Sequence, residues 1–194
     1  MTPEEFMRFL AGRRSYRRFA QTPVPQPVID DLLEAARTAS CGANRQTLKY
    51  LVVQSPDMVE KTHAHVHWAA YLPPEQGAPK PGERPVLYLA ACQDTALPGG
   101  SDLDLGLALG SMTAAAWAHG VGSCILGAID RPVLAALYHL PAQMTLCNLV
   151  AFGYPACQSR VVPMQGGDVK YYLDEQGNTC VPKRPLAEIL IGRV

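Results

Sequence analysis

Apolar and polar positions along the chain follow two different repeats. An apolar stripe that recurs every three to four residues predicts helices over about 3–11, 28–38 and 130–140, and Ser55-Pro56 opens a further one. Uninterrupted apolar, β-prone runs predict strands at about 48–54, 85–92, 121–126 and 146–152. Helices that alternate with strands in this way are typical of an α/β or α+β sandwich around one central sheet.

Two of the expected helices carry clear start signals. Thr2 with Glu5 forms the pattern of a capping box, and Ser101 with Asp104 repeats it before a long apolar stretch. Gly120 is suited to end this second, long helix because glycine readily takes the left-handed conformation of a helix terminus.

The stretch Leu105–Ile129 contains no charged residue, which raises the question of a membrane span. Its many glycine, serine and threonine residues dilute the apolar character too far, so a buried helix, a turn and a buried strand fit better. The small residues of the long helix allow close approach of another backbone. That backbone belongs either to the central sheet or to a second copy of the chain.

Composition narrows the class of protein. A chain of 194 residues is expected to fold as a single domain over 1–194. Its charged fraction of 18% is below the roughly 25% of soluble domains, which favours a surface hidden in a homodimer. The formal net charge of zero argues against nucleic acid as a partner. No apolar export signal and no CxxC pair among six cysteines predict a cytoplasmic protein with reduced thiols and no membrane association.

Basic side chains are concentrated in two places far apart in the sequence. One is Arg13-Arg14-Ser15-Tyr16-Arg17, and the other is Pro182-Lys183-Arg184-Pro185. Guanidinium groups and a hydroxyl grip phosphate through charge-assisted hydrogen bonds, so the first cluster is a candidate anion site. Taken alone, it is equally compatible with a solvated basic loop.

Two further segments have a functional and a purely structural interpretation. Asn44-Arg45-Gln46 carries amides that suit the edge of a heteroaromatic ring, but amides also close turns. The run from Gly120 to Ala128 brings glycines before its strand, so it is not a dinucleotide fingerprint, in which they follow the strand. Its Gly127 would let a flat ring approach the backbone, although a buried strand with glycine turns explains the run equally well.

Metal and hydrolase chemistry find little support. His63, His65 and His67 are closely spaced, but no HExxH motif is present, and we expect no metal site. No Gly-x-Ser-x-Gly elbow occurs, and neither Cys41 nor Cys124 has an evident histidine partner, so a hydrolase is not expected.

The segments singled out above, in this order, resemble the FMN-dependent nitroreductase family over nearly the whole chain. The matching segments are 13–19, 40–46, 120–128 and 181–186. Three more, at 68–72, 82–85 and 168–172, are similar to a subgroup common in anaerobic bacteria. The resemblance implies an α+β sandwich with a central mixed or antiparallel sheet flanked by helices. It also implies an interlocked homodimer, with C-terminal segments wrapped around the partner and two FMN at the interface.

The resemblance further assigns roles to individual residues. Arg13, Lys183 and Arg184 would hold the FMN phosphate, Ser15 would bond near the ribityl chain or phosphate, and Arg17 would lie beside the pyrimidine edge. A backbone N–H at Leu126 or Gly127 would face flavin N5. The complete set of cofactor-binding residues implied is Arg13, Arg14, Ser15, Arg17, Ser40, Cys41, Asn44, Gln46, Leu126, Gly127, Lys183 and Arg184, and the amide segment would come from the other subunit.

The activity implied is a ping-pong cycle in which NADH or NADPH reduces FMN and an organic acceptor then reoxidises it. The link Gln93–Ser101 is short, which predicts an open pocket and broad tolerance for small organic acceptors such as nitroaromatics, quinones or activated alkenes. Two alternatives stay open. One is a specialised relative that dehalogenates its substrate or dehydrogenates a peptide, and the other is a flavin-binding module without enzymatic activity.

Overall fold

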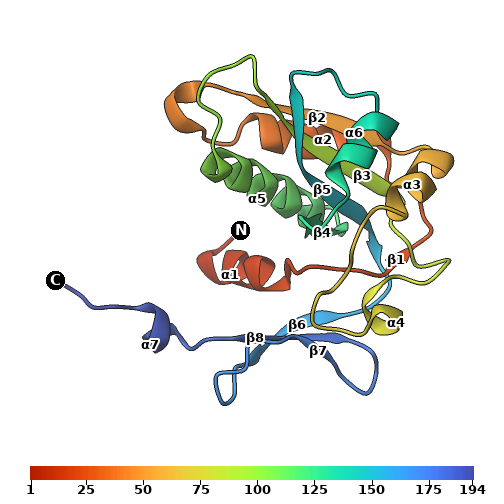
Figure 1. Ribbon diagram of the computed structural model, residues 1–194. Coiled ribbons are helices and arrows are strands. Elements are labelled where there is room, and N and C mark those ends of the chain that lie inside the picture. Colours follow the sequence, from red (N-terminus) through yellow and green to blue (C-terminus); the bar gives the residue numbers. More distant parts are fainter.

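The computed structural model describes residues 1–194 and is built around one five-stranded sheet (Figure 1). Its strands are β1 (Phe19–Ala20), β2 (Leu48–Val53), β3 (Leu87–Asp94), β4 (Gly122–Leu126) and β5 (Met144–Pro155). The long strand β5 pairs with β3 along one edge and with β4 and then β1 along the other, and β2 pairs with β3. All four pairings are antiparallel, which confirms the α+β class.

Helices cover both faces of this sheet (Figure 1). The helices are α1 (Pro3–Gly12), α2 (Gln26–Arg37), the 3₁₀ turn η1 (Gly42–Asn44), α3 (Pro56–His63), α4 (Pro74–Gly77), α5 (Asp102–Ala118), α6 (Arg131–Leu137) and α7 (Leu186–Ile189). Side chains alternate along β3, as the two-residue repeat of a strand requires. Leu87 and Leu89 pack with α2 and α5, whereas Tyr88 and Ala90 pack with α3 and α6.

The start signal of the first helix is confirmed, and that of the long helix is confirmed in part. Both hydrogen bonds of the Thr2–Glu5 capping box are present. At α5 the Ser101 hydroxyl accepts the Asp104 N–H at 3.1 Å, but the Asp104 carboxylate does not return to Ser101. It accepts the N–H of Gly42 instead, at 2.8 Å, so the second capping box is only half formed.

The two faces of the long helix α5 differ in burial. One face is buried against the sheet and α2, with Met112 and Ala116 fully enclosed. On the other face Leu103 and Leu107 are 71% and 43% exposed, and open space surrounds Gly106. The helix ends as expected, with Gly120 at a φ of +70°.

The C-terminal part of the chain forms a second sheet that the apolar pattern does not predict. Its strands β6 (Ser159–Pro163), β8 (Thr179–Lys183) and β7 (Tyr172–Leu173) lie in that order. They are two to five residues long and include Arg160 and Lys183, so no continuous apolar run marks them. Beyond them, the tail through Ile191 extends away from the rest of the molecule (Figure 1). None of the helices has the length and apolar content that crossing a bilayer requires.

Candidate functional site

A pocket of about 350 Å³ gathers most of the basic residues singled out in the sequence. Four cations and no carboxylate line it, and we call it the cation pocket. Its lining residues are Arg13, Arg14, Ser15, Arg17, Thr113, Ser123, Ile125, Tyr171, Val181 and Lys183. Thr113, Ser123, Ile125, Tyr171 and Val181 were not among the predicted binding residues. Thr113 lies outside every matching segment, and the other four lie within matching segments in which they were assigned no role.

Aromatic packing on α5 fixes the position of the loop that carries the arginines. A Cβ on Gly12 would lie 3.0 Å from the Trp117 ring, so a side chain here would force the ring to shift and loosen this close approach of α1 to α5. Tyr16 stacks on the same Trp117 ring with centroids 5.5 Å apart. Its N–H donates to the Ser123 carbonyl at 2.9 Å, which holds the arginine loop beside β4.

The cations of this pocket lack anionic partners. Arg13 donates to the Thr113 hydroxyl at 3.1 Å, and Arg14 donates to the Arg13 carbonyl at 2.8 Å. Burial and the neighbouring Arg13 charge both lower the pKa of Arg14, as expected where like charges are crowded together. Such a site favours an anion that compensates the positive charge.

The second basic cluster reaches this pocket through one residue only. Lys183 ends strand β8 and lines the pocket, so residues 170 positions apart in sequence meet there. Arg184 lies outside the lining and pairs with Glu188 at 2.9 Å. In this single chain, therefore, only part of the predicted convergence is formed.

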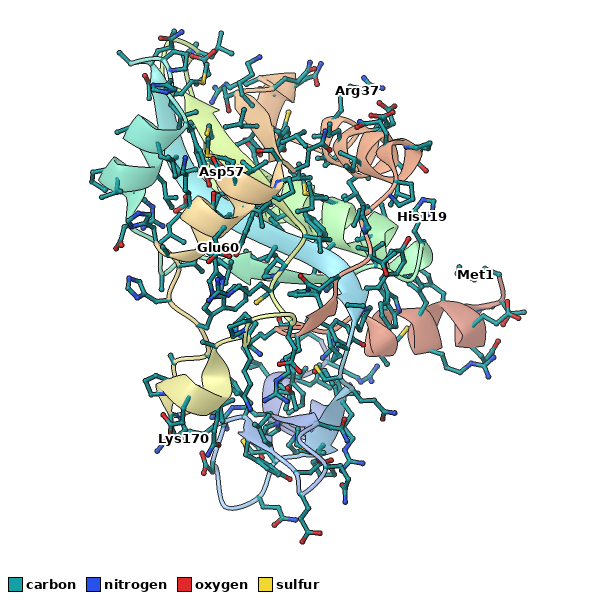
Figure 2. All side chains as sticks on the ribbon, turned by 90° about the vertical axis from the view of Figure 1, so that its right-hand side faces the viewer. Met1, Arg37, Asp57, Glu60, His119 and Lys170 are labelled. Carbon is teal, nitrogen blue, oxygen red and sulfur yellow. The ribbon has the colours of Figure 1, made fainter.

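An aromatic pair closes one side of the cation pocket. The guanidinium of Arg17 lies 4.8 Å from the centroid of the Tyr171 ring, within the range of a cation–π interaction. Tyr171 in turn packs against Tyr71, with ring centroids 5.1 Å apart. Two of the segments that resemble the anaerobic subgroup thus lie side by side, and the adjacent Lys170 is on the same side of the molecule as α4 (Figure 2).

Strand β4 brings its exposed end to the same region. Ser123 and Ile125 line the cation pocket, and Gly127 follows directly after the last residue of β4. Neither the Gly127 N–H nor the Ala128 N–H donates a hydrogen bond within the chain. Both residues are exposed, so these two donors are available to a ligand.

The amide segment, residues 40–46, lies elsewhere and is strained; we call it the amide loop. Ala43, Asn44 and Gln46 have φ values of 50°, 53° and 50°, a conformation that costs a residue with a side chain about 1–2 kcal/mol. The buried Asp104 carboxylate anchors the loop through Gly42. Strain of this kind clusters at binding and catalytic sites.

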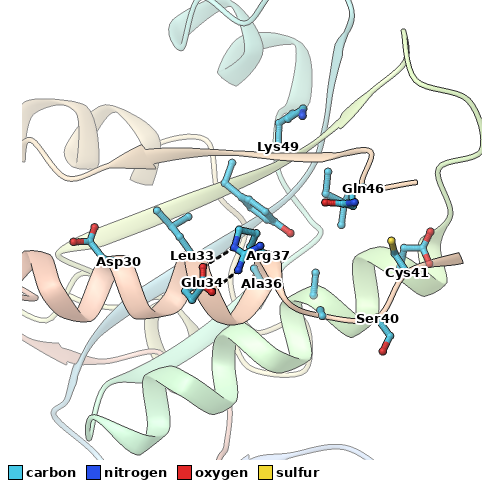
Figure 3. Close-up of a pocket in the computed structure, with 14 residues that line it drawn as sticks. Asp30, Leu33, Glu34, Ala36, Arg37, Ser40, Cys41, Gln46 and Lys49 are labelled. Carbon is cyan, nitrogen blue, oxygen red and sulfur yellow. Dashed lines mark hydrogen bonds and ion pairs between the residues drawn. The ribbon is translucent and has the colours of Figure 1, made fainter. Parts of the chain in front are cut away.

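The amide loop borders a second pocket of about 510 Å³, which we call the edge pocket. It lies between α2, the free edge of β2 and the start of α5, and Figure 3 shows Ser40, Cys41 and Gln46 at one end of it. Asn44 does not line it. The complete lining is Asp30, Leu33, Glu34, Ala36, Arg37, Ala39, Ser40, Cys41, Gln46, Leu48, Lys49, Tyr50, Asp104 and Ala108.

The cation pocket and the edge pocket share no lining residue. Asp104 at one pocket and Thr113 at the other are nine residues apart on α5, which corresponds to about 13 Å along the helix axis. One copy of the chain therefore does not bring the amide loop to the arginines.

The histidine and cysteine candidates lie in structural surroundings. His63 approaches the Tyr88 hydroxyl at 3.4 Å, while His65 and His67 both bond Asp130 and hold the pKa of that carboxyl below its usual range. Burial raises the pKa of the Cys124 thiol, which disfavours a thiolate nucleophile at neutral pH.

Comparison with known proteins agrees with this arrangement of motifs. The nitroreductase family profile matches residues 10–154. The FMN reductase [NAD(P)H] of Bacillus subtilis is 27% identical over 182 residues, covering 82% of this chain and 69% of the relative. Iodotyrosine deiodinase 1 of Rattus norvegicus is 43% identical over 61 residues, but these cover only 31% of this chain and 21% of the deiodinase.

The fold agrees as well. The crystal structure of a nitroreductase family protein from Clostridium difficile 630 superimposes with a TM-score of 0.69, at 18% identity and with 96% of both chains covered. Together with the family match over most of the sequence, this settles the classification. The chain belongs to the nitroreductase family of oxidoreductases.

Proposed function

We propose that the protein is an FMN-dependent oxidoreductase that takes electrons from NADH or NADPH and passes them to small organic acceptors. The observation that carries this proposal is the cation pocket, where four cations face one cavity without a carboxylate. A phosphate ester is an anion that suits such a site. The FMN reductase of Bacillus subtilis supports the choice of FMN, and so does membership of the family.

The lining residues fit the two ends of this cofactor. Arg13, Arg14 and Lys183 would hold the phosphate, with the Ser15 hydroxyl beside it. Arg17 would lie at the pyrimidine edge, where its charge favours electron-rich flavin. The free N–H groups of Gly127 and Ala128 would donate hydrogen bonds to the flavin ring. Arg184 would join the phosphate only after leaving Glu188.

FMN, when bound, supplies the hydride chemistry by which NAD(P)H is oxidised and a nitroaromatic, quinone or similar acceptor is reduced in a ping-pong order. The protein contributes binding, orientation and electrostatics. The connection between β3 and α5 is a loop without an inserted helix, which supports an open site and broad acceptor tolerance.

We also propose that the ring contacts of the amide loop come from a second copy of the chain. Ser40, Cys41, Asn44 and Gln46 lie away from the cation pocket of their own chain. A two-fold dimer through the open face of α5 would bury Leu103 and Leu107. The dimer would also cover the exposed C-terminal tail. The tail of one subunit would bind against the apolar walls of the other subunit's edge pocket, beside the free edge of β2.

The dimer is tested by light scattering on the full chain and on a chain that ends at Pro185. We expect the mass of a dimer for the former and a large loss of dimer for the latter. A monomeric full chain would contradict the shared site.

The cofactor assignment is tested by the absorbance of the purified protein before and after incubation with FMN. We expect a yellow protein whose visible bands bleach under nitrogen with NADH or NADPH and return on addition of a quinone. Protein that stays colourless after incubation would overturn the proposal. Bound FMN that no reduced nicotinamide bleaches would favour a flavin-binding module instead.

A second candidate is reductive dehalogenation, favoured by the 43% identity to iodotyrosine deiodinase over 61 residues. The protein would be reduced under nitrogen with one equivalent of dithionite, so that no free reductant remains, and then mixed with iodotyrosine or with a nitroaromatic. Release of iodide at a rate well above nitro reduction would favour this candidate.

A further inference from the structure

The backbone that leaves strand β4 is held at every carbonyl from Leu126 to Ala128. Each of these three oxygens accepts one hydrogen bond from a different part of the chain. The donors are, in order, Asn148 Nδ2 at 3.1 Å, Arg131 Nη2 at 3.0 Å and the His67 N–H at 3.0 Å. Leu126 is the last residue of β4, and Gly127 and Ala128 are exposed and lie beyond it. Three consecutive fixed carbonyls leave the peptide planes of this segment little freedom to rotate.

The N–H groups of the same segment are free. The carbonyl of Leu126 and the N–H of Gly127 belong to one peptide unit, and the carbonyl of Gly127 and the N–H of Ala128 belong to the next. A hydrogen bond to a carbonyl polarises its peptide unit and strengthens the N–H as a donor. Asn148 therefore acts on the Gly127 N–H, and the charged Arg131 acts on the Ala128 N–H.

Arg131 contacts the segment after β4 instead of a carboxylate. It is the first residue of α6, where the helix dipole disfavours a cation, and it forms no ion pair. Its hydrogen bonds all go to backbone carbonyls: Nη2 to Gly127, and both Nε and Nη2 to Cys147 at 3.2 Å and 2.8 Å. The planar fork of arginine suits two carbonyls at once.

A β-bulge supplies the anchor for this arginine. The β3–β5 pairing steps from Ala91 opposite Asn148 to Cys92 opposite Leu146, so Cys147 is the extra residue in β5. A bulge leaves the extra residue outside the regular ladder and re-aims its neighbours. Here the Cys147 carbonyl is left to Arg131, and the adjacent Asn148 side chain reaches Leu126.

We infer that Asn148 and Arg131 are positioning residues that fix and polarise the Gly127 and Ala128 N–H groups for an acceptor atom of the ring bound at this site. The inference rests on the proposed FMN function and deepens it. The bulge at Cys147 is the structural device that holds both residues in place. Neither residue needs to touch the ring.

The test is hydrogen–deuterium exchange of the Gly127 and Ala128 amides, resolved by NMR or by fragmentation mass spectrometry, without and with saturating FMN. In the wild type we expect fast exchange that slows at least tenfold on FMN binding. Asn148→Leu should lose this slowing mainly at Gly127. Arg131→Met should lose it mainly at Ala128, and Arg131→Lys should restore part of it because an ammonium still reaches one carbonyl.

Affinity separates positioning from gross damage. Because each variant weakens about one hydrogen bond from the backbone to the ring and none to the phosphate, the Kd for FMN should rise by no more than about tenfold. Lys61→Met, which removes a cation from α3, is the control and should leave both amides slowed. Unfolding midpoints identify a variant that fails to fold. If Asn148→Leu fails to fold, the two Arg131 variants test the inference on their own.

The outcomes are distinguishable. Wild-type protein that takes up no FMN overturns the proposed function and this inference with it. FMN uptake with no slowing at Gly127 or Ala128 overturns the inference alone, as does full slowing in folded Asn148→Leu and Arg131→Met.

Discussion

The cation pocket and the amide loop differ in how the chain builds them. Three separate regions of sequence form the pocket: the loop after α1, strand β4 with Thr113 of α5, and the C-terminal segments that bear Tyr171 and Lys183. The amide loop is local, spanning residues 40–46, and three of its residues are in the left-handed conformation.

This difference corresponds to two different roles. The cation pocket concentrates positive charge, because the fold of a single chain brings remote basic residues together. The loop presents amide groups in a strained conformation that the buried Asp104 holds, but it presents them away from its own chain's arginines. Under the proposed function, one subunit would supply the phosphate contacts, whereas ring recognition would require two subunits.

The largest effect is expected when the pocket loses two cations. In Arg13→Met/Lys183→Met the Kd for FMN should rise at least about 100-fold, because each charge-assisted bond contributes about 1.5–3 kcal/mol. Titration of the apoprotein with FMN and with riboflavin, which lacks the phosphate, measures this. Riboflavin binding should change little. Arg184→Met is the matched control and should matter less, since Arg184 pairs with Glu188.

A smaller effect is expected at the other end of the pocket. Arg17→Ala should make bound flavin harder to reduce, by about 1.5–3 kcal/mol, because a cation that favours the electron-rich form is lost. Potentiometric titration of the variant and of Arg17→Lys, which keeps the charge, measures the shift. An unchanged midpoint potential in Arg17→Ala would remove this residue from the site.

The amide loop should affect turnover more modestly. Asn44→Ala removes hydrogen bonds of about 0.5–1.5 kcal/mol each, so kcat/KM for a quinone should fall up to about tenfold while FMN binding persists. Refolding this variant together with Arg13→Met/Lys183→Met should restore activity, because mixed dimers contain one intact site. A mixture no more active than its separate components would place both halves of the site in one chain.

The smallest effect concerns the strain itself. Ala43→Gly should raise the free energy of unfolding by about 0.5–1 kcal/mol, since glycine takes a φ of 50° without steric cost. Ala118→Gly, at the end of α5, should lower it by up to about 1 kcal/mol. Chemical denaturation measures the free energy of unfolding of both variants, which should change in opposite directions. Destabilisation by Ala43→Gly would show that the loop is relaxed.

Much of the fold follows from local rules. Apolar repeats place the main helices and the four long strands within a few residues, and Thr2 and Gly120 act as a helix start and a helix end. The second sheet escaped prediction because its short strands depend on pairing between β6 and β8 rather than on an apolar run. The Asp104 carboxylate escaped as well, because its partner Gly42 is 62 residues away.

The site shows the same limit. Composition marks the arginines as candidates, but only the fold shows that Lys183 joins them and that Arg184 does not. Tyr171 lies in a segment that resembles the anaerobic subgroup, but that resemblance assigns no role to its side chain. Arg131 and Asn148 could not be identified from the sequence either, because their role depends on a β-bulge that no local sequence pattern predicts.

Lys183, which lines the cation pocket, belongs to the C-terminal sheet, the least enclosed part of the molecule. Retention of FMN would therefore depend on this sheet staying folded. Parts of a protein with few buried contacts open at lower free energy than its core. On heating, we therefore expect flavin to be released as this small sheet opens, before the antiparallel core melts. Flavin emission would then rise at a lower temperature than the loss of far-ultraviolet ellipticity, and the gap would narrow as free FMN is added.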